Sequence, residues 1–258
     1  MSDQPNLGVR AAGNLIGGSG AGLLIVASLG AFGGLYSGAL LAAGTGVAAA
    51  GMLSVLPELG RLPRAWRGWL VRQAIAAAVL FPLAIAAVVL PLLVKLVWMP
   101  ALVFLYCQAR ALEVSTDVPA WRSPLIMPLM IVTGIAEGAG LLLLLAPLAL
   151  ETAVPEWVAG VLIAAVAARQ FVWMSYRRRM TGGEAPIEAA AELLAFSTPF
   201  ALGGNVMPMV LAMAVGVMPE MGSAALAAAG LAAVGGGWAL KVIIVTKAAH
   251  GGGAKNPG

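Results

Sequence analysis

Long apolar segments recur along the whole chain, and they constrain its fold more than any other feature. A helix needs about 20 mostly apolar residues to cross the hydrocarbon core of a bilayer. Eight segments of this kind cover residues 16–36, 39–56, 70–89, 92–111, 124–148, 158–176, 198–217 and 222–245. Because they are continuous rather than short and alternating, they favour helices over a β-barrel. The sequence therefore predicts an all-α polytopic membrane protein with eight transmembrane helices.

The composition agrees with this interpretation. Hydrophobic residues make up 61% of the chain and charged residues only 10%, with a mean hydropathy of +0.95. Soluble domains are roughly 45–50% apolar and about 25% charged. We expect one integral membrane domain over residues 1–258, with helices 1–4 within 1–118 and helices 5–8 within 119–258. We find no small-residue cleavage pattern after a short apolar segment, so we expect an uncleaved first helix.

Cysteine and histidine are almost missing from the sequence. Cys107 and His250 are the single examples of each type. One thiol forms no internal disulfide and holds no four-cysteine iron–sulfur cluster, and a haem between helices normally needs two axial side chains. We therefore expect no haem and no metal in this chain. Cys107 falls in a predicted span and is expected to be a small core residue.

Basic residues gather in alternate loops. Four arginines fall within residues 56–72, and the other basic positions of these loops and of the termini are Arg10, Arg110, Arg122, Arg177, Arg178, Arg179, Lys247 and Lys255. The remaining loops contain Glu151, Glu156 and Glu220, with Lys95 as their basic residue. The positive-inside rule then predicts that both termini and the basic face lie in the cytoplasm, in a bacterial inner membrane. A basic face could also serve to dock an acidic partner.

Two charged residues fall inside predicted spans. Glu137 lies on the order of 20 Å deep, where a carboxylate usually handles protons or ions, although a protonated one can bond across helices. We assign Glu137 to a proton path. Lys241 lies roughly 9 Å below the basic edge, where it can snorkel to the surface or contribute to a headgroup site. The difference in depth, about 10 Å, argues against a direct ion pair between them.

The segment 56–72 has the chemistry of a site for a flat redox ligand. Guanidinium and indole faces stack on such a ligand, and arginine donates to carbonyl oxygens. Trp66 and Trp69 could equally be aromatic-belt anchors. Glu58 could accept a proton from a quinol or form a surface salt bridge, and Asn14 could bind a quinone carbonyl or cap the first helix. The expected quinone-binding residues are Asn14, Glu58, Arg61, Arg64, Trp66, Arg67 and Lys241, with Gln73, Gln108 and Gln170 as weaker candidates.

Glycine and proline patterns predict packing and distortion. Gly18 with Gly22, and Gly134 with Gly138, have the spacing that lets membrane helices approach closely. The seventh span contains Pro199 and Pro208 around two glycines, which predicts a broken or kinked helix. Residues 186–196 place two glutamates four apart and predict an interfacial helix leading into that span.

Several segments together resemble a known family. They are 11–22 (AAGNLIGGSGAG), 58–73 (ELGRLPRAWRGWLVRQ), 106–112 (YCQARAL), 119–124 (PAWRSP), 133–140 (TGIAEGAG) and 237–250 (GWALKVIIVTKAAH). They are similar to the quinone-reactive membrane anchors of the polysulfide reductase (NrfD-like) and dimethyl sulfoxide reductase superfamily, especially subunits of the phenylacetyl-CoA acceptor oxidoreductase type. The resemblance implies eight haem-free helices in two four-helix bundles. Glu58 stands where some relatives have a histidine implicated with quinol, and Gln73 stands where a glutamate is common.

The same resemblance implies the partners. A ferredoxin-like subunit with four iron–sulfur clusters would dock on the basic face, and it would bind a molybdopterin catalytic subunit. This chain would then carry electrons between the last cluster and ubiquinone or menaquinone, without acting on the catalytic substrate and without binding nucleic acid. The alternatives are a secondary transporter that uses Glu137 and Lys241, and an anchor that never touches quinone.

Overall fold

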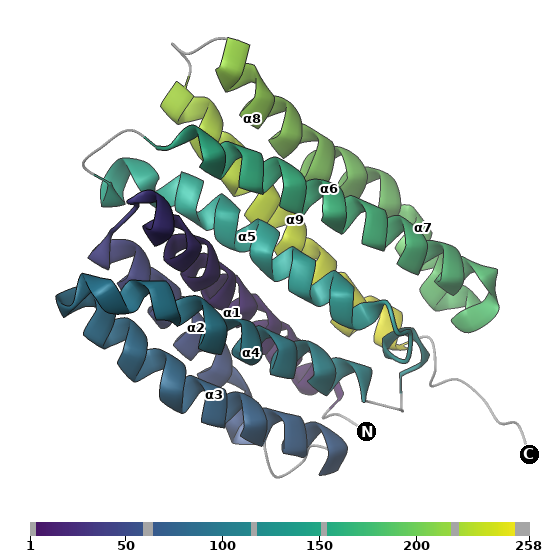
Figure 1. Cartoon of the computed structure of the whole chain (residues 1–258). Coiled ribbons are helices and arrows are strands. Elements are labelled where there is room, and N and C mark those ends of the chain that lie inside the picture. The colour runs from purple at the N-terminus through teal and green to yellow at the C-terminus, as the bar shows by residue number, and fades with distance from the viewer. Residues whose placement is uncertain (1–3, 59–63, 115–117, 151–153, 218–221, 251–258) are drawn as a thin grey trace, which may run out of the picture.

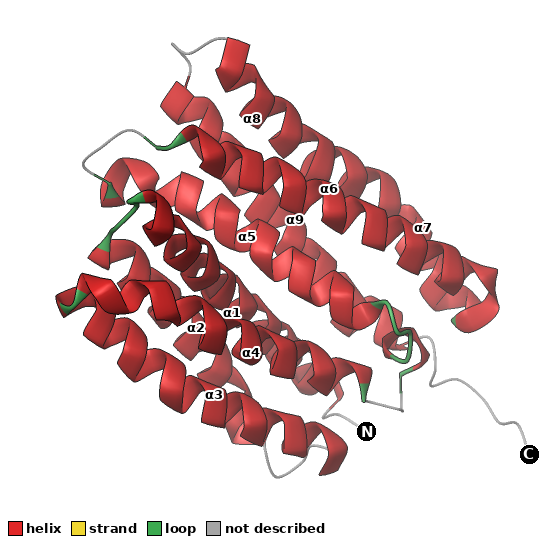
Figure 2. Ribbon diagram, in the orientation of Figure 1, coloured by secondary structure: helices red, strands yellow, loops and turns green. Residues whose placement is uncertain are grey.

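The computed structural model describes residues 4–58, 64–114, 118–150, 154–217 and 222–250, and their side chains except at residues 4–12, 58, 119, 216, 217 and 248–250. These residues form helices joined by short loops, with no strand in the ranges just given (Figure 2). The long helices are α1 (Gln4–Gly30), α2 (Gly38–Val55), α3 (Arg64–Val89), α4 (Val94–Glu113), α5 (Ile126–Ala149), α6 (Glu156–Arg179), α7 (Ile187–Pro199), α8 (Met207–Val217) and α9 (Gly222–His250). Short helical turns flank them: η1 (Ala31–Gly33), η2 (Leu56–Glu58), η3 (Pro91–Leu93), η4 (Pro119–Trp121), η5 (Met180–Glu184) and η6 (Phe200–Val206).

The helices are long and apolar enough to make eight membrane crossings, which confirms the predicted fold class. Within the described residues eight candidate spans occur, and α7, η6 and α8 together form the seventh, Ile187–Val215. Large apolar side chains such as Val79, Phe171 and Met213 are exposed on the outside of the bundle. A soluble monomer rarely exposes so much apolar surface, whereas a lipid-covered one must. The chain is an all-α polytopic membrane protein.

The helices form two groups (Figure 1). Helices α1 to α4 pack on one another, and α5, α6, α8 and α9 do the same. Contacts between the groups come mainly from α1 and α4 against α5, and from α1 against α9. Helix α1 therefore lies at the centre, where it is buried along most of its described length.

Glycines set how closely α1 approaches α5. A Cβ atom on Gly22 would lie 1.8 Å from the carbonyl oxygen of Gly134, and one on Gly138 would lie 2.0 Å from the carbonyl carbon of Gly22. No side chain fits at either position, because the obstacle is backbone. The close approach predicted for this glycine spacing is confirmed at Gly22, Gly134 and Gly138, whereas Gly18 faces the side chain of Gln108.

The seventh span begins earlier than predicted, at Ile187 rather than at residue 198. The helix predicted at residues 186–196 is α7, which leads through η6 into α8 without interruption. The distortion predicted around the two glycines takes the form of the π-helical segment η6 within a continuous helix. Pro208 lacks the N–H that an α-helix would aim at Gly204 O, so that carbonyl is free for another donor.

All the arginine-rich helix ends lie at one end of the bundle. It is the end where α1 begins and α9 ends in Figure 1. We call it the arginine-rich end, and its described arginines are Arg64, Arg67, Arg72, Arg110, Arg122, Arg177, Arg178 and Arg179. Two bonds fix η4 here: Trp121 Nε1 donates to Ile244 O at 3.0 Å, and Tyr176 OH donates to Ala120 O at 2.9 Å.

Candidate functional site

A buried ion pair between α5 and α9 forms the centre of the site. Lys241 Nζ donates to Glu137 Oε2, and both side chains are fully buried. The ammonium also donates to Leu15 O on α1 at 2.7 Å. Ser19 Oγ donates to the same Glu137 oxygen at 2.7 Å, and Trp238 Nε1 donates to Ser19 Oγ at 2.9 Å. Three helices thus supply one hydrogen-bonded chain.

Gly237 makes room for the carboxylate. A Cβ atom at Gly237 would lie 2.2 Å from Glu137 Oε1, so any larger residue would displace the acid. Gly237 lies one helical turn before Lys241, on the same side of α9. Gly237 therefore provides the space for the carboxylate, and Lys241, four residues later on α9, provides its cationic partner.

The expectation that Glu137 and Lys241 lie too far apart in depth was wrong. That expectation counted the depth of each residue from a predicted loop, and the two loop positions do not lie at the same depth. Counted from the arginine-rich helix ends, Ile126 and His250, their depths are about 17 Å and about 14 Å. A lysine side chain spans the difference. Lys241 therefore does not snorkel: its exposed fraction is 1%.

Arg169 on α6 is a second buried cation, and the sequence analysis missed it. Nε donates to Asn205 Oδ1 at 2.8 Å, Nη1 donates to Ala233 O at 3.0 Å, and Nη2 donates to Gly204 O. The last acceptor is the carbonyl that Pro208 leaves free. The signal that could have found Arg169 was an arginine in the middle of the apolar segment 158–176.

Buried amides form a third cluster on the other side of α1. Gln73 Nε2 donates to Asn14 Oδ1 at 3.2 Å, and Gln108 Nε2 donates to Asn14 O. Asn14 does not cap a helix, because α1 begins at Gln4 and Asn14 lies within it. The carbonyls of Asn14 and Leu15 are consecutive and accept side-chain donors from the two bundles. Helix α1 therefore links the amide cluster to the ion pair. The third glutamine candidate lies elsewhere: Gln170 Oε1 accepts from Asn205 Nδ2 at 2.8 Å.

Of the quinone-binding residues expected in segment 56–72, some lie outside the described residues and the others differ in exposure. Arg61 and the side chain of Glu58 lie outside the described residues. Arg64 is exposed and Arg67 is half-buried at the start of α3. Trp66 is no aromatic-belt anchor, because its exposed fraction is 3% and its ring packs edge-on against Trp121.

Trp69 has the surroundings that were expected of Trp66. The Arg72 guanidinium lies 4.3 Å from the centre of the Trp69 ring, and the Arg110 guanidinium lies 5.3 Å from it. Tyr106 packs edge-on against the same ring. Cys107, its neighbour, is buried, as the sequence predicts. Cationic donors and a π-surface thus meet at Trp69, on the same helix as Gln73.

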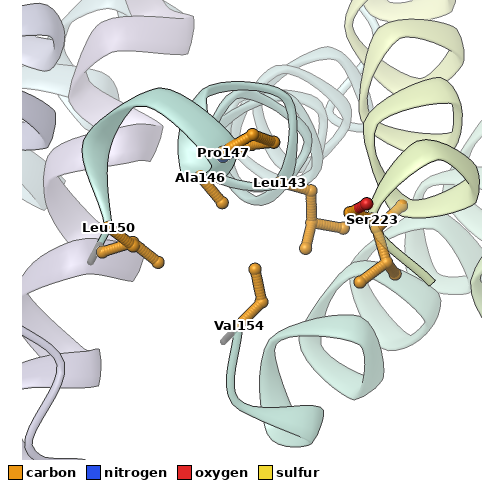
Figure 3. A pocket seen from close by; sticks show the side chains of 7 residues that line it. Leu143, Ala146, Pro147, Leu150, Val154 and Ser223 are labelled. Carbon is orange, nitrogen blue, oxygen red and sulfur yellow. The ribbon is translucent and has the colours of Figure 1, made fainter. Parts of the chain in front are cut away.

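A small cavity of about 120 Å³ lies elsewhere, at the end opposite the arginines (Figure 3). Its lining is apolar apart from one serine and consists of Leu143, Ala146, Pro147, Leu150, Val154, Ser223 and Leu226. It contains none of the residues of the ion pair or of the amide cluster. The described side chains also contain no group of three His, Cys, Asp or Glu residues placed to hold a metal ion.

No family model matches this chain, and no curated protein or solved structure matches it either. Function is therefore inferred from the residues themselves. The arrangement combines a buried carboxylate that can accept a proton, two buried cations, and an arginine-rich end with an aromatic surface.

Proposed function

We propose that this chain is the quinone-reactive membrane subunit of a molybdopterin iron–sulfur oxidoreductase. A partner chain supplies iron–sulfur clusters, and electrons pass between its last cluster and ubiquinone or menaquinone in the membrane. The chain supplies binding, orientation and proton transfer, and the cofactors supply the redox chemistry. The resemblance of segments 58–73, 106–112 and 237–250 to quinone-reactive anchors supports this proposal.

The single observation that carries the proposal is the environment of Trp69. A quinone headgroup is flat and has two carbonyl acceptors. The guanidinium groups of Arg72 and Arg110 lie over the Trp69 ring, so strong donors and an aromatic surface occur together here. Asn14 and Gln73 place amide groups further along the same bundle. These groups suit a polar headgroup whose isoprenoid tail remains in lipid.

The arginine-rich end suits the docking of the iron–sulfur partner. Its arginines surround the helix ends that carry Trp69, so an acidic partner seated there would bring a cluster close to the headgroup. The same charges favour a cytoplasmic location for this end, in a bacterial inner membrane. The docking of the partner and the orientation of this chain in the membrane thus involve the same surface.

A secondary transporter is the second candidate function. The observation that favours it is the buried Glu137–Lys241 pair, together with Arg169 of α6, which donates to Gly204 O in the π-helical segment η6. In that case these charged side chains would bind the transported ion or solute. The two candidate functions predict different binding partners for the chain in the membrane.

Purification separates the candidates. An affinity-tagged chain should be extracted from its native membrane with mild detergent. A quinone-reactive subunit co-purifies with a chain that shows iron–sulfur absorbance, and the complex reduces a quinone analogue or oxidises its quinol. A chain that elutes alone, without that absorbance, and moves an ion in proteoliposomes would overturn the proposal.

A further inference from the structure

Trp238 stands out on α9 because of its depth. It lies about 18 Å from the helix end at His250 and about 24 Å from the helix start at Gly222, in the interior of the eighth span. Tryptophan in membrane proteins is enriched at the two membrane–water interfaces, where one end of the ring is apolar and the other is wet. An indole N–H within the hydrocarbon core needs an acceptor from the protein instead. A role as an interfacial anchor therefore does not explain the position of Trp238.

The acceptor is Ser19 on α1. Trp238 Nε1 donates to Ser19 Oγ at 2.9 Å, and Ser19 is fully buried, whereas the exposed fraction of Trp238 is 37%. The indole thus reaches from the outer surface of the bundle to a buried hydroxyl. The next hydrogen bond leads from that hydroxyl to Glu137. Two hydrogen bonds therefore connect the buried carboxylate with a side chain at the lipid-facing surface of α9.

Donors and acceptors give this chain of hydrogen bonds a direction. An indole nitrogen donates and does not accept, so the hydrogen of the Ser19 hydroxyl cannot bond to Trp238. The other hydrogen-bond partner of Ser19 Oγ is Glu137 Oε2, at 2.7 Å, and a carboxylate oxygen accepts. Ser19 therefore accepts from Trp238 and donates to Glu137. The bond from Trp238 thus fixes the orientation of the hydroxyl.

The same direction favours an ionised Glu137. Oε2 accepts from Ser19 and from Lys241, whereas Oε1 has no hydrogen-bond partner. The hydrogen bonds that hold the carboxylate therefore act at a single oxygen. A proton bound to Oε2 would point at a donor hydrogen and displace it. Ser19 is thus one of two donors that favour the ionised form of the acid over the protonated form.

Few charged groups face Glu137. Among the described side chains, the buried charged ones are Glu137, Lys241 and Arg169. Arg169 donates to three uncharged oxygens and not to the carboxylate. Lys241 divides its donors between Glu137 and Leu15 O. The charge state of Glu137 thus depends on Lys241 for a direct counter-charge and on Ser19 for the second hydrogen bond.

We propose that Trp238 and Ser19 are positioning residues for Glu137: the indole N–H directs the Ser19 hydroxyl at the carboxylate and keeps the acid ionised. For Glu137 to take up a proton at Oε2, the Ser19 hydrogen must leave that oxygen, and Ser19 Oγ then accepts from the new carboxyl O–H. Leu15 O lies one turn earlier on α1, where a serine in a helix can donate instead. This positioning role rests on the proton-transfer role in the proposed function and specifies what controls it.

Trp238→Phe tests the positioning role, because it removes the N–H group and keeps an aromatic ring. Infrared difference spectra of the full chain, purified in detergent with any partner chains it carries, detect the C=O stretching band of a protonated carboxyl group. The band of Glu137 is identified by its loss in Glu137→Gln. At neutral pH the ratio of protonated to ionised Glu137 should be about five- to tenfold higher in Trp238→Phe than in wild type, which corresponds to the loss of one ordinary hydrogen bond.

The matched control is Trp173→Phe, because the indole N–H of Trp173 is buried and has no partner, and its removal should leave the Glu137 band as in wild type. Ser19→Ala should increase the band as Trp238→Phe does. Adding Trp238→Phe to Ser19→Ala should then change it no further, because the indole acts through Ser19. Trp238→Leu takes the place of Trp238→Phe if that variant does not accumulate.

An unchanged band in Trp238→Phe, or a further increase in the double variant, would overturn the positioning role. A Glu137 band of full size in the wild type at neutral pH would do the same. The measurement needs no turnover, so it separates the two proposals. The expected band change in a chain that purifies without redox partners would disprove the proposed function alone, and an unchanged band in a complex that reduces a quinone analogue would disprove the positioning role alone.

Discussion

Glu137 and Lys241 are 104 residues apart in the sequence, yet they form an ion pair in which both side chains are fully buried. Each stands on a different helix, and Ser19 and Leu15 of α1 complete the hydrogen bonds. A buried pair of this kind contributes little net stability, but removing one partner leaves an uncompensated charge. Its presence in a chain so poor in charge is the basis for assigning it a function.

Removal of either partner should destabilise the protein more than removal of both. Lys241→Met and Glu137→Gln each leave one polar partner buried without its counterpart, at a cost of about 3–5 kcal/mol. The double variant should recover much of this loss. Thermal unfolding in detergent, followed by intrinsic tryptophan fluorescence, measures all three. Strictly additive losses in the double variant would show that the two side chains do not interact.

Gly237→Ala should lower the midpoint of thermal unfolding, because the new methyl group would lie 2.2 Å from Glu137 Oε1. Overpacking of this kind costs typically about 1–3 kcal/mol. The matched control is Gly235→Ala on the same helix, where a Cβ atom meets nothing within 4 Å. We expect the control to unfold at or above the wild-type temperature. Equal behaviour of the two variants would contradict the assigned role of Gly237.

Arg169→Lys should destabilise the seventh span although it keeps the charge. A single ammonium cannot reproduce the fork that reaches Asn205 Oδ1, Ala233 O and Gly204 O. Hydrogen bonds to charged groups contribute about 1.5–3 kcal/mol each. Limited proteolysis and thermal unfolding measure the loss, with the exposed Arg178→Lys as the control. A variant as stable as wild type would show that the lysine finds equivalent acceptors.

Arg72→Ala should weaken quinone turnover while the complex remains assembled. Arg72 is exposed and contributes its guanidinium to the Trp69 surface, so its loss affects the headgroup more than the fold. Arg64→Ala, at the start of the same helix, should have the same effect, to a degree that depends on its distance from the headgroup. Turnover of the purified complex, titrated with a quinone analogue, gives KM and kcat. Unchanged values in Arg72→Ala would remove Trp69 from the quinone site.

Part of the site could be anticipated from the sequence. Glu137 and Lys241 stand out because charge is rare within long apolar segments, and Gly22, Gly134 and Gly138 have a spacing that permits close packing. Arg169 could have been found by the same reasoning. The acceptors of Arg169 could not have been found in this way, because Gly204 O can accept from a side chain only where Pro208 follows a π-helical segment. The relative depth of two residues on different helices also depends on where each helix ends.

The apolar segments alone determined the all-α membrane fold, because a chain in lipid must satisfy its backbone hydrogen bonds within each helix. The composition likewise limited the possible sites in this chain, because it contains only one cysteine and one histidine. Only the tertiary structure decided that Glu137 meets Lys241, that two arginine side chains lie over the ring of Trp69 rather than that of Trp66, and that α1 joins two polar clusters. Contacts between helices depend on the rotation and relative depth of each helix. The close packing of glycines against the backbone of a neighbouring helix helps to fix both.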